Sequence, residues 1–350
     1  MRNVVKSFSR RNLILSISAL AVANGASQGR AADDKAPVAI QFVLDRPIDA
    51  VAAPFVLAST RGLYGAENLA VTTTVASGSR DAIARVASGA SDMALADINA
   101  LVRYRDAADA VPIKAVFVLL NQAPYAIVAR RSRGVTSLGS LDGKTLGIAE
   151  GDLAIRLWPA LARRNNIKLA NVKQEKISAA VREPMLSAGQ VDAVSGFSYL
   201  SAVNLRDRGV PADDLAVFRF GDYGSAAYGL AVIANPKFVA EKPEAVKAFV
   251  RAIATATQLT IQQPAKAIDD VLTQMESGSR DLELERLRVA IRDNILTDDV
   301  RRDGLGGIDP ARFETSIGEI AEDFTFHRRP TASDVFDDAF LPGSMGRKIN

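Results

Sequence analysis

Short apolar runs alternate with amphipathic stretches from residue 38 onward, and this alternation predicts an α/β fold. The first four runs, at 38–44, 71–75, 91–96 and 113–120, have the length of strands and are separated by helical patterns. Such a β-α-β-α-β-α-β order favours a parallel sheet with helices on both faces. In sheets of this kind, ligands bind beyond the carboxyl ends of the strands.

The same pattern starts again near residue 125. Further strands are expected at 125–129, 145–149, 172–175, 190–195, 215–220 and 230–234. From residue 236 onward the chain is predicted to be mostly helical, and residues 242–263 carry an apolar stripe of helical period. No low-complexity linker separates the two α/β units, so we expect them to pack as the lobes of one cleft.

The segment 141–159 shows how one wall of that cleft is expected to form. Asp142-Gly143 favours a tight turn, residues 145–149 favour a buried strand, and Pro159 favours the first turn of a helix. Residues 151–158 between them are predicted to be a loop that is free to line the cleft. The candidate ligand contacts in this loop are Gly151, Asp152, Arg156 and Trp158.

The N-terminus has the pattern of an export signal. Basic residues precede an apolar run at 13–23, and small residues lead to a cleavage site after Ala31 or Ala32. The Arg10-Arg11 pair resembles a twin-arginine signal, and an ordinary Sec signal is the alternative. Residues 1–32 are therefore predicted to be a signal peptide, and the mature protein is expected in the periplasm.

Removal of this segment changes the charge of the protein. Residues 1–32 hold five Lys or Arg and no acidic residue, so cleavage takes the net charge from +3 to −2. The basic character of the full chain thus gives no support for nucleic-acid or membrane-surface binding. No later segment is long and apolar enough for a transmembrane helix. We expect a monomer with a small-molecule ligand and no nucleic-acid partner.

The absence of cysteine limits the chemistry that the chain can perform. Disulfides, thiolate nucleophiles and cysteine-based metal sites are excluded, and His327 is the only histidine. A metal site built on a pair of histidines is excluded too, and few general bases are available. We therefore predict no catalytic residue, no metal and no cofactor.

Candidate ligand contacts are the polar and aromatic residues at predicted strand ends. In the first unit they are Arg46, Pro47, Ser77, Gly78, Ser79, Asp97, Asn99 and Gln122. Residues 77–79 could present N–H and hydroxyl groups to an anionic or carbonyl oxygen, although glycine and serine are also common turn formers. Asp97 or Asn99 could contact a polar ligand, or Asp97 could only cap the helix that follows.

The second unit offers Ser195 and Phe197 at a strand end, besides the loop residues named above. Arg156 could pair with a carboxylate, sulfonate or phosphate, or it could only be solvated. Trp158 could stack on a flat ligand or pack in the core. Four tyrosines at strand ends or between the units would suit a planar organic ligand, although tyrosine also favours half-buried loops. They are Tyr125, Tyr199, Tyr223 and Tyr228.

Several motifs, in order and spacing, resemble the periplasmic substrate-binding proteins of bacterial ABC importers. They are Pro54-Phe-Val-Leu-Ala-Ser-Thr-Arg-Gly-Leu-Tyr64, Ser77-Gly-Ser79, Val86-Ala-Ser-Gly-Ala-Ser-Asp-Met-Ala94, Ser140-Leu-Asp-Gly-Lys-Thr-Leu-Gly147 and Gly189-Gln-Val-Asp-Ala-Val194. The similarity covers about residues 38–325 and is greatest to the nitrate/sulfonate/taurine type, which includes binders of thiamin pyrimidine precursors.

The resemblance implies a two-lobed, type II-like binding-protein fold. Lobe I would comprise residues 33–125 and 227–350, and lobe II residues 126–226, with crossings near 122–125 and 222–228. The implied function is a receptor that captures a small organic molecule, such as a sulfonate, an aromatic or a pyrimidine-like compound. Closure of the lobes would hold the ligand for delivery to an ABC permease in the inner membrane.

Two other functions are compatible with this fold. An exported enzyme could use Asp97 or Glu150, but related eukaryotic pyrimidine synthases carry a cysteine-rich motif and histidines that this chain lacks. A protein that presents its ligand to a membrane receptor would share the same architecture. Our leading prediction is the non-enzymatic receptor.

Overall fold

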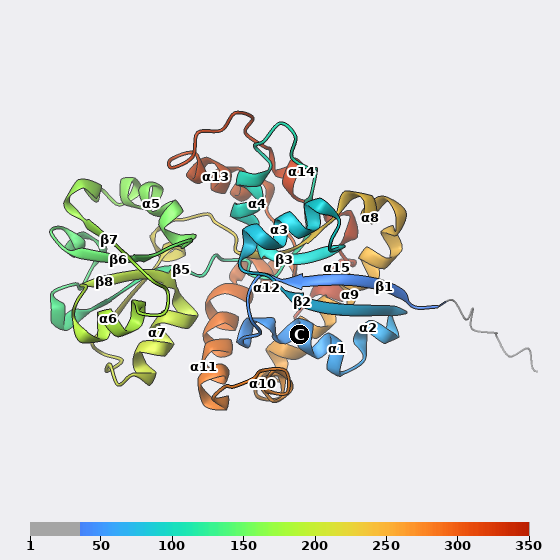
Figure 1. Ribbon diagram of the computed structural model, residues 1–350, viewed down its shortest axis with the longest axis horizontal. Coiled ribbons are helices and arrows are strands. Elements are labelled where there is room, and N and C mark those ends of the chain that lie inside the picture. The colour runs from blue at the N-terminus through green and yellow to red at the C-terminus, as the bar shows by residue number, and fades with distance from the viewer. Residues whose placement is uncertain (1–35, 350) are drawn as a thin grey trace, which may run out of the picture. The chain divides into compact units, whose positions relative to one another are not determined.

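Two five-stranded sheets, each flanked by helices, organise the computed structural model, which describes residues 36–349 (Figure 1). The predicted signal peptide lies outside the described residues. The first sheet has the order β2-β1-β3-β10-β4. Its strands are β1 (Val38–Leu44), β2 (Leu69–Val75), β3 (Met93–Asp97), β4 (Lys114–Val118) and β10 (Leu230–Ala234).

Helices cover both faces of the first sheet. One face carries α1 (Ala53–Thr60), α2 (Leu63–Ala66) and α9 (Pro243–Gln262), and the other carries α3 (Ser79–Ser88) and α4 (Ile98–Tyr104). Phe42 of β1 shows how the first face is held, because its ring lies 5.0 Å from that of Phe55 in α1 and 5.1 Å from that of Phe249 in α9. All three rings are buried, so the apolar stripe predicted in 242–263 does face the core.

The second sheet has the order β7-β6-β8-β5-β9. Its strands are β5 (Tyr125–Arg130), β6 (Thr145–Ala149), β7 (Lys173–Ile177), β8 (Ala193–Phe197) and β9 (Leu215–Arg219), and its helices are α5 (Trp158–Arg164), α6 (Arg182–Ala188) and α7 (Ser198–Asp207). Successive residues of β5 face opposite sides of the sheet. Ile127 belongs to the apolar cluster that contains Trp158 of α5, whereas Val128 belongs to the cluster of α6 and α7.

The C-terminal part is helical, as predicted. It contains α8 (Pro236–Glu241), α10 (Pro264–Leu272), α11 (Arg280–Ala290), α12 (Asp298–Asp303), α13 (Pro310–Ile320), α14 (Ala332–Val335) and α15 (Ser344–Arg347). A π-helical turn, Ile291–Ile295, continues α11. Two of these helices pack against elements that flank the second sheet: α11 contacts α7, and α13 contacts the 3₁₀ turn before α5.

The predicted parallel pairing is confirmed for β2, β1 and β3, and β4 runs in the same direction, but β4 does not pair with β3. In the first sheet, β10 lies antiparallel between β3 and β4, so β3 and β4 are not neighbours. All five residues of β10 are buried, and the strand comes from a part of the chain more than 100 residues away from β4. A local pattern cannot reveal an insertion of this kind, because each run predicts a strand but not its neighbours.

The predicted loop 151–158 is also shorter than expected. A 3₁₀ turn occupies Ala154–Leu157, and α5 begins directly afterwards at Trp158. The carboxylate of Asp152 accepts a hydrogen bond of 2.8 Å from the Ala154 N–H, which starts the turn. The short loop that remains, residues 150–153, is the part of this segment that is free to shape a cavity.

Candidate functional site

A cavity of about 510 Å³ lies between the carboxyl ends of β1 and β2 in the first sheet and those of β6 and β8 in the second. Both sheets therefore supply walls. Eight predicted contacts line this cavity: Arg46, Pro47, Ser77, Gly78, Ser79, Gly151, Asp152 and Phe197. Its volume falls in the range of sites for small organic ligands.

The wall from the first sheet is built around the buried carboxylate of Asp45. Arg46 donates to it from Nε at 2.9 Å and Nη2 at 2.8 Å, and the Ser79 hydroxyl donates at 2.7 Å. Burial lowers the pKa of Arg46, but the adjacent Asp45 charge outweighs this effect and raises it well above its ordinary value. The guanidinium is thus a permanent positive charge whose partner is already in place.

The N-terminus of α3 forms the rest of this wall. Gly78 precedes the helix with φ of +129°, a conformation that favours glycine. The Ser77 N–H and hydroxyl both donate to Asp81 in the first turn, at 2.9 and 3.2 Å. Both serine hydroxyls therefore donate within the protein, and they offer a ligand their lone pairs rather than their protons.

The wall from the second sheet centres on Asp152. Its carboxylate accepts the Ala154 N–H and, in a short contact, the hydroxyl of Ser195 in β8. Burial raises the pKa of Asp152, and the hydrogen bond from Ser195 opposes that shift. Ser195, a predicted contact, thus acts on the cavity through Asp152, since it does not line the cavity itself.

Sequence reasoning missed Arg182, which also lines the cavity. Its Nε donates to Glu183 at 2.9 Å, and Glu183 also accepts the Ser201 hydroxyl at 2.8 Å. Gly196 leaves room for this side chain, because a Cβ there would lie 2.9 Å from Arg182 Nη1. The only signal in the sequence was its position soon after β7, where a strand end meets a helix start.

Phe197 supplies the aromatic surface of the cavity. Arg46 lies over its ring, 4.9 Å from the centroid, and the rings of Tyr125 and Tyr199 are each 6.0 Å away. Tyr199 is buried, and its hydroxyl is 3.5 Å from Arg46 Nη1. The cavity thus combines one aromatic face with three arginines, Arg46, Arg80 and Arg182, and with three carboxylates, of which Asp45 and Asp152 are engaged.

Asp97 and Asn99 lie outside the cavity lining, in a buried network between the sheets. The Tyr125 hydroxyl donates to Asp97 Oδ2 at 2.5 Å, and Asn99 Nδ2 donates to Asp97 Oδ1 at 3.0 Å and to the Tyr228 carbonyl at 2.7 Å. Asp97 also accepts the Asn99 N–H at 2.8 Å, as a helix cap does. Burial raises the pKa of Asp97 to about 6 against these hydrogen bonds.

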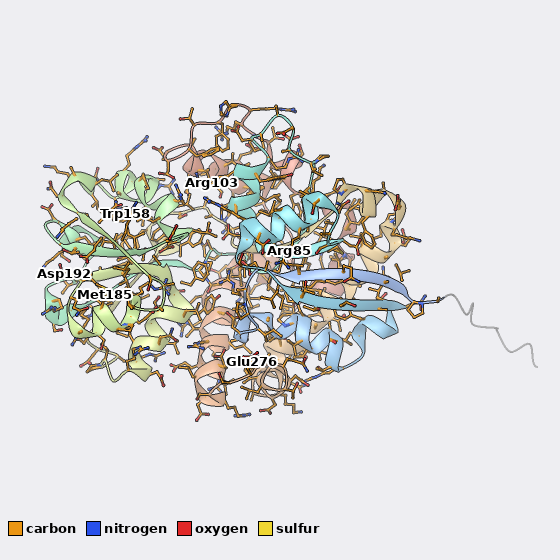
Figure 2. The ribbon with its side chains drawn as sticks, in the orientation of Figure 1. Arg85, Arg103, Trp158, Met185, Asp192 and Glu276 are labelled. Carbon is orange, nitrogen blue, oxygen red and sulfur yellow. The ribbon has the colours of Figure 1, made fainter. Side chains whose placement is uncertain are left out.

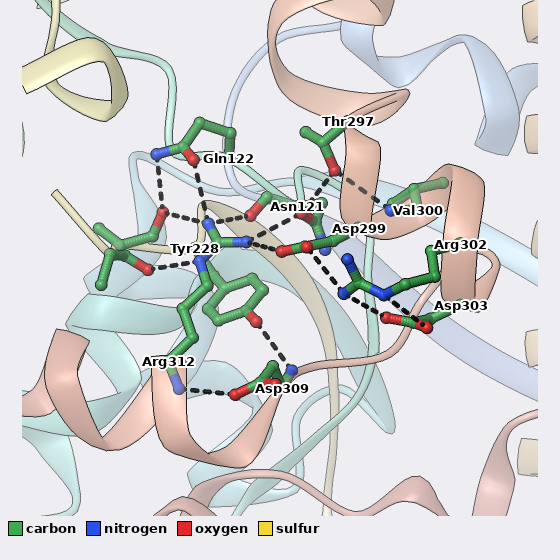
Figure 3. A network of polar contacts seen from close by, with 12 residues as sticks. Asn121, Gln122, Tyr228, Thr297, Asp299, Val300, Arg302, Asp303, Asp309 and Arg312 are labelled. Carbon is green, nitrogen blue, oxygen red and sulfur yellow. Dashed lines mark hydrogen bonds and ion pairs between the residues drawn. The ribbon is translucent and has the colours of Figure 1, made fainter. Parts of the chain in front are cut away.

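Gln122 and Tyr228 meet at Arg312 instead (Figure 3). The Arg312 guanidinium lies 4.0 Å from the Tyr228 ring centroid and donates to Gln122 Oε1 at 3.1 Å. It also contacts the Asn121 side chain and Asp299, each at 3.0 Å. These contacts fix the segment that leaves the first sheet for the second. Tyr223 lies in a 3₁₀ turn, and the centroid of its ring is 6.0 Å from that of Phe218.

Arg156 and Trp158 line a neighbouring cavity rather than the central one. Arg156 pairs with Asp323 at 3.6 Å, and Trp158 is buried at the start of α5, on the α5 side of the second sheet (Figure 2). Within residues 36–349, no cluster of three or more His, Asp or Glu side chains is arranged to hold a metal. No helix in that range is long and apolar enough to cross a bilayer.

A family model described as NMT1/THI5 like matches residues 49–267, which is more than half of the chain. The chain belongs to this family. Among curated relatives of this NMT1/THI5-like protein, a 4-amino-5-hydroxymethyl-2-methylpyrimidine phosphate synthase of Schizosaccharomyces pombe is 25% identical over 63% of the chain and 64% of the relative. The riboflavin-binding protein RibY of Chloroflexus aurantiacus is 28% identical over 67% and 66%. The chain thus spans just under two thirds of the length of both.

Solved structures share the fold of this NMT1/THI5-like chain. The periplasmic aliphatic sulphonate binding protein SsuA of Escherichia coli superposes with a TM-score of 0.70 at 12% identity, covering 88% of this chain and 94% of that one. The periplasmic nitrate-binding protein NrtA of Synechocystis PCC 6803 gives 0.62 at 13% identity, with 87% of each chain covered. The predicted two-lobed binding-protein fold is confirmed, as is the resemblance on which it rested.

Proposed function

We propose that this protein is a periplasmic receptor that captures a small organic molecule and delivers it to an ABC permease. The observation that carries the proposal is the central cavity, to which strand ends of both sheets contribute. A ligand that contacts both walls favours the closed arrangement by its differential affinity for it. The similarity to SsuA and NrtA supports the same reading.

The moving parts would be the two lobes, residues 33–125 with 227–350 and residues 126–226. The connections at 122–125 and 222–228 would act as the hinge. Asn121 and Gln122 are held by Arg312, and Asn294 of the π-helical turn donates to the Gln122 carbonyl at 3.1 Å. Tight anchoring on the first-lobe side would confine the backbone rotation to the few residues beyond it.

The cavity favours an organic ligand with a flat or apolar part over a bare inorganic anion. Phe197 presents an aromatic surface, and Leu200, Leu153 and Pro47 add apolar atoms. Arg46 and Arg182 each already have a carboxylate partner, and the charge of exposed Arg80 is offset by that of Glu150 in the same lining, so the net positive charge available to an anion is small. Pyrimidine-like and flavin-like heterocycles fit this character and agree with the names of the relatives.

A thermal-shift screen with isothermal titration calorimetry tests the proposal. The mature chain should be stabilised by one class among sulfonates, aromatic acids, pyrimidines and flavins, by about 2.7 kcal/mol at a hundredfold excess over Kd. Phe197→Ala should abolish this stabilisation, whereas Phe326→Ala, a half-buried phenylalanine outside the cavity, should retain it. Absence of stabilisation by every class would overturn the receptor function.

The synthase relatives make an exported enzyme the second candidate. Glu150 lines the cavity and could act as an acid or base, whereas Asp97 does not line it. Turnover of a bound pyrimidine that is lost in Glu150→Gln would establish this alternative. Ligand-dependent capture of a membrane receptor instead of a permease would establish a sensory role.

A further inference from the structure

A second cavity, of about 980 Å³, adjoins the central one. Both are lined by the backbone segment 149–152 and by Ala179, so only one short loop lies between them. Gly151 in this loop has φ of +76° and open space around it. A molecule held in the central cavity could therefore extend past the loop into the second one.

Trp158 contributes a buried hydrogen-bond donor, without an acceptor in the described part of the chain, to this second cavity. Its side chain lines the cavity and is 1% exposed, and its indole N–H has no hydrogen-bond acceptor among the described residues. A buried donor without a partner costs on the order of 1–3 kcal/mol. Nε1 itself is buried, so a ligand acceptor would reach it, and remove that cost, only after a small shift of the side chains that cover it.

The other polar groups of the cavity fall into two sets. Two of its three carboxylates are engaged, because Asp152 accepts from Ser195 and Ala154, and Asp323 pairs with Arg156 and Arg103 at 3.6 and 3.5 Å. The third, Glu150, is exposed and has no side-chain partner within residues 36–349. Gln174 and Lys176 are two residues apart in β7, so they point to the same face, and both line the cavity. Neither has a polar side-chain partner within residues 36–349.

We propose that the ligand has two parts, a flat or apolar body in the central cavity and an oxygen-bearing arm in the second. The arm would accept hydrogen bonds from Trp158 Nε1 and from the side chains of Gln174 and Lys176. This inference rests on the proposed receptor function and narrows its ligand class. A neutral polyol and a phosphate ester share the required chemistry, since both present acceptor oxygens, but only a phosphate would gain strongly from the Lys176 charge.

Trp158 is the only tryptophan of the chain, so its indole N–H gives a single resonance in a ¹⁵N-tryptophan-labelled sample. Three probes share a related ring system: lumichrome without an arm, riboflavin with a polyol arm, and flavin mononucleotide with a phosphate arm. Thermal shift reports binding, and the indole resonance reports a new hydrogen bond at Trp158. We expect the two armed probes to move the resonance and lumichrome to leave it in place.

Two variants separate the arm from the body. Trp158→Phe should weaken the armed probes about five- to tenfold and leave lumichrome binding unchanged. If that variant does not fold, Lys176→Ala on the exposed edge strand serves instead and should weaken flavin mononucleotide more than riboflavin. Lys173→Ala is the matched control, because Lys173 is exposed on the same strand but does not line the cavity.

The possible outcomes test the two-part ligand separately from the receptor function on which it rests. A thermal shift by an armed probe with the indole resonance unmoved overturns the two-part ligand and leaves the receptor function standing. Equal effects of Lys176→Ala and Lys173→Ala count against the arm in the same way. No thermal shift by any of the three probes overturns the inference together with the flavin-like ligand class.

Discussion

The Tyr125 hydroxyl donates a 2.5 Å hydrogen bond to the carboxylate of Asp97, and this bond links the two sheets. Tyr125 begins β5 of the second sheet, and Asp97 ends β3 of the first. Both side chains are buried, and burial together with the nearby Asp97 charge raises the pKa of Tyr125 well above its ordinary value. Tyr125 is therefore the donor in this pair whenever Asp97 is ionised.

Tyr125→Phe should lower the free energy of unfolding by about 1–3 kcal/mol, because a buried carboxylate loses its shortest hydrogen bond. Urea denaturation at pH 7 measures the change. Tyr223→Phe is the control, since the Tyr223 hydroxyl has no hydrogen bond among the described residues, and it should change stability by less than about 0.5 kcal/mol. Equal effects of the two substitutions would contradict the role given to Tyr125.

The raised pKa of Asp97, about 6, predicts a dependence of stability on pH. Between pH 4 and 6 the unfolded chain releases the Asp97 proton while the folded protein keeps it. The folded state therefore loses stability relative to the unfolded state as pH rises through this window. The total contribution is roughly 3 kcal/mol, from a shift of about two pKa units.

Asp97→Asn removes this contribution because the amide does not titrate. The difference in unfolding free energy between wild type and Asp97→Asn should change across pH 4 to 6 and be constant above pH 7. Denaturation curves at half-unit pH intervals test this. A difference that stays flat through the window would show that Asp97 titrates with an ordinary pKa.

Replacing Arg312 by lysine should destabilise the protein more than the same replacement at the neighbouring Arg302. The planar guanidinium of Arg312 contacts Asn121, Gln122, Asp299 and the Tyr228 ring at once, which lysine cannot reproduce. Arg312→Lys should therefore cost about 2–3 kcal/mol of stability. Arg302→Lys is the matched control, because Arg302 pairs with Asp299 and Asp303 at an exposed position, and this substitution should leave stability almost unchanged.

Gly196→Ala should weaken ligand binding more than it weakens the fold. The added Cβ would lie 2.7 Å from Ser201 Oγ and 2.9 Å from Arg182 Nη1, so the Arg182 side chain must move within the cavity. We expect about a tenfold rise in Kd by calorimetry. Gly65→Ala, in α2 with open space around it, should leave Kd unchanged and raise stability by up to about 1 kcal/mol. Unchanged affinity in Gly196→Ala would remove Arg182 from the site.

Local sequence patterns predicted most strands, because apolar runs and turn residues are short-range signals, whereas the binding-protein fold followed from the resemblance to periplasmic substrate-binding proteins. The patterns also placed Ser77 to Ser79, Gly151, Asp152 and Phe197 at strand ends, and the structure gathers these residues around one cavity. What they could not predict was which partners each polar group meets. Asp97 looks the same in the sequence whether it meets a ligand or the Tyr125 hydroxyl, since that contact depends on two sheets docking.

The same limit explains why the roles of Arg182 and Trp158 could not be predicted from the sequence. Arg182 reaches the cavity because Gly196, in another strand, leaves space for it. Trp158 could be assigned to core or ligand from its sequence context alone, and the structure gives it features of both, a buried ring and an unpartnered N–H beside a cavity. Long-range packing decides both cases.

The position of β10 between β3 and β4 has a consequence for how the chain folds during synthesis. All five strands of the second sheet lie within residues 125–219, so this sheet can assemble as soon as that stretch is available. The first sheet cannot close, although its first four strands emerge earlier, until residues 230–234 arrive to fill the gap between β3 and β4. Truncation before residue 230 should therefore leave two unpaired strand edges and an aggregation-prone fragment.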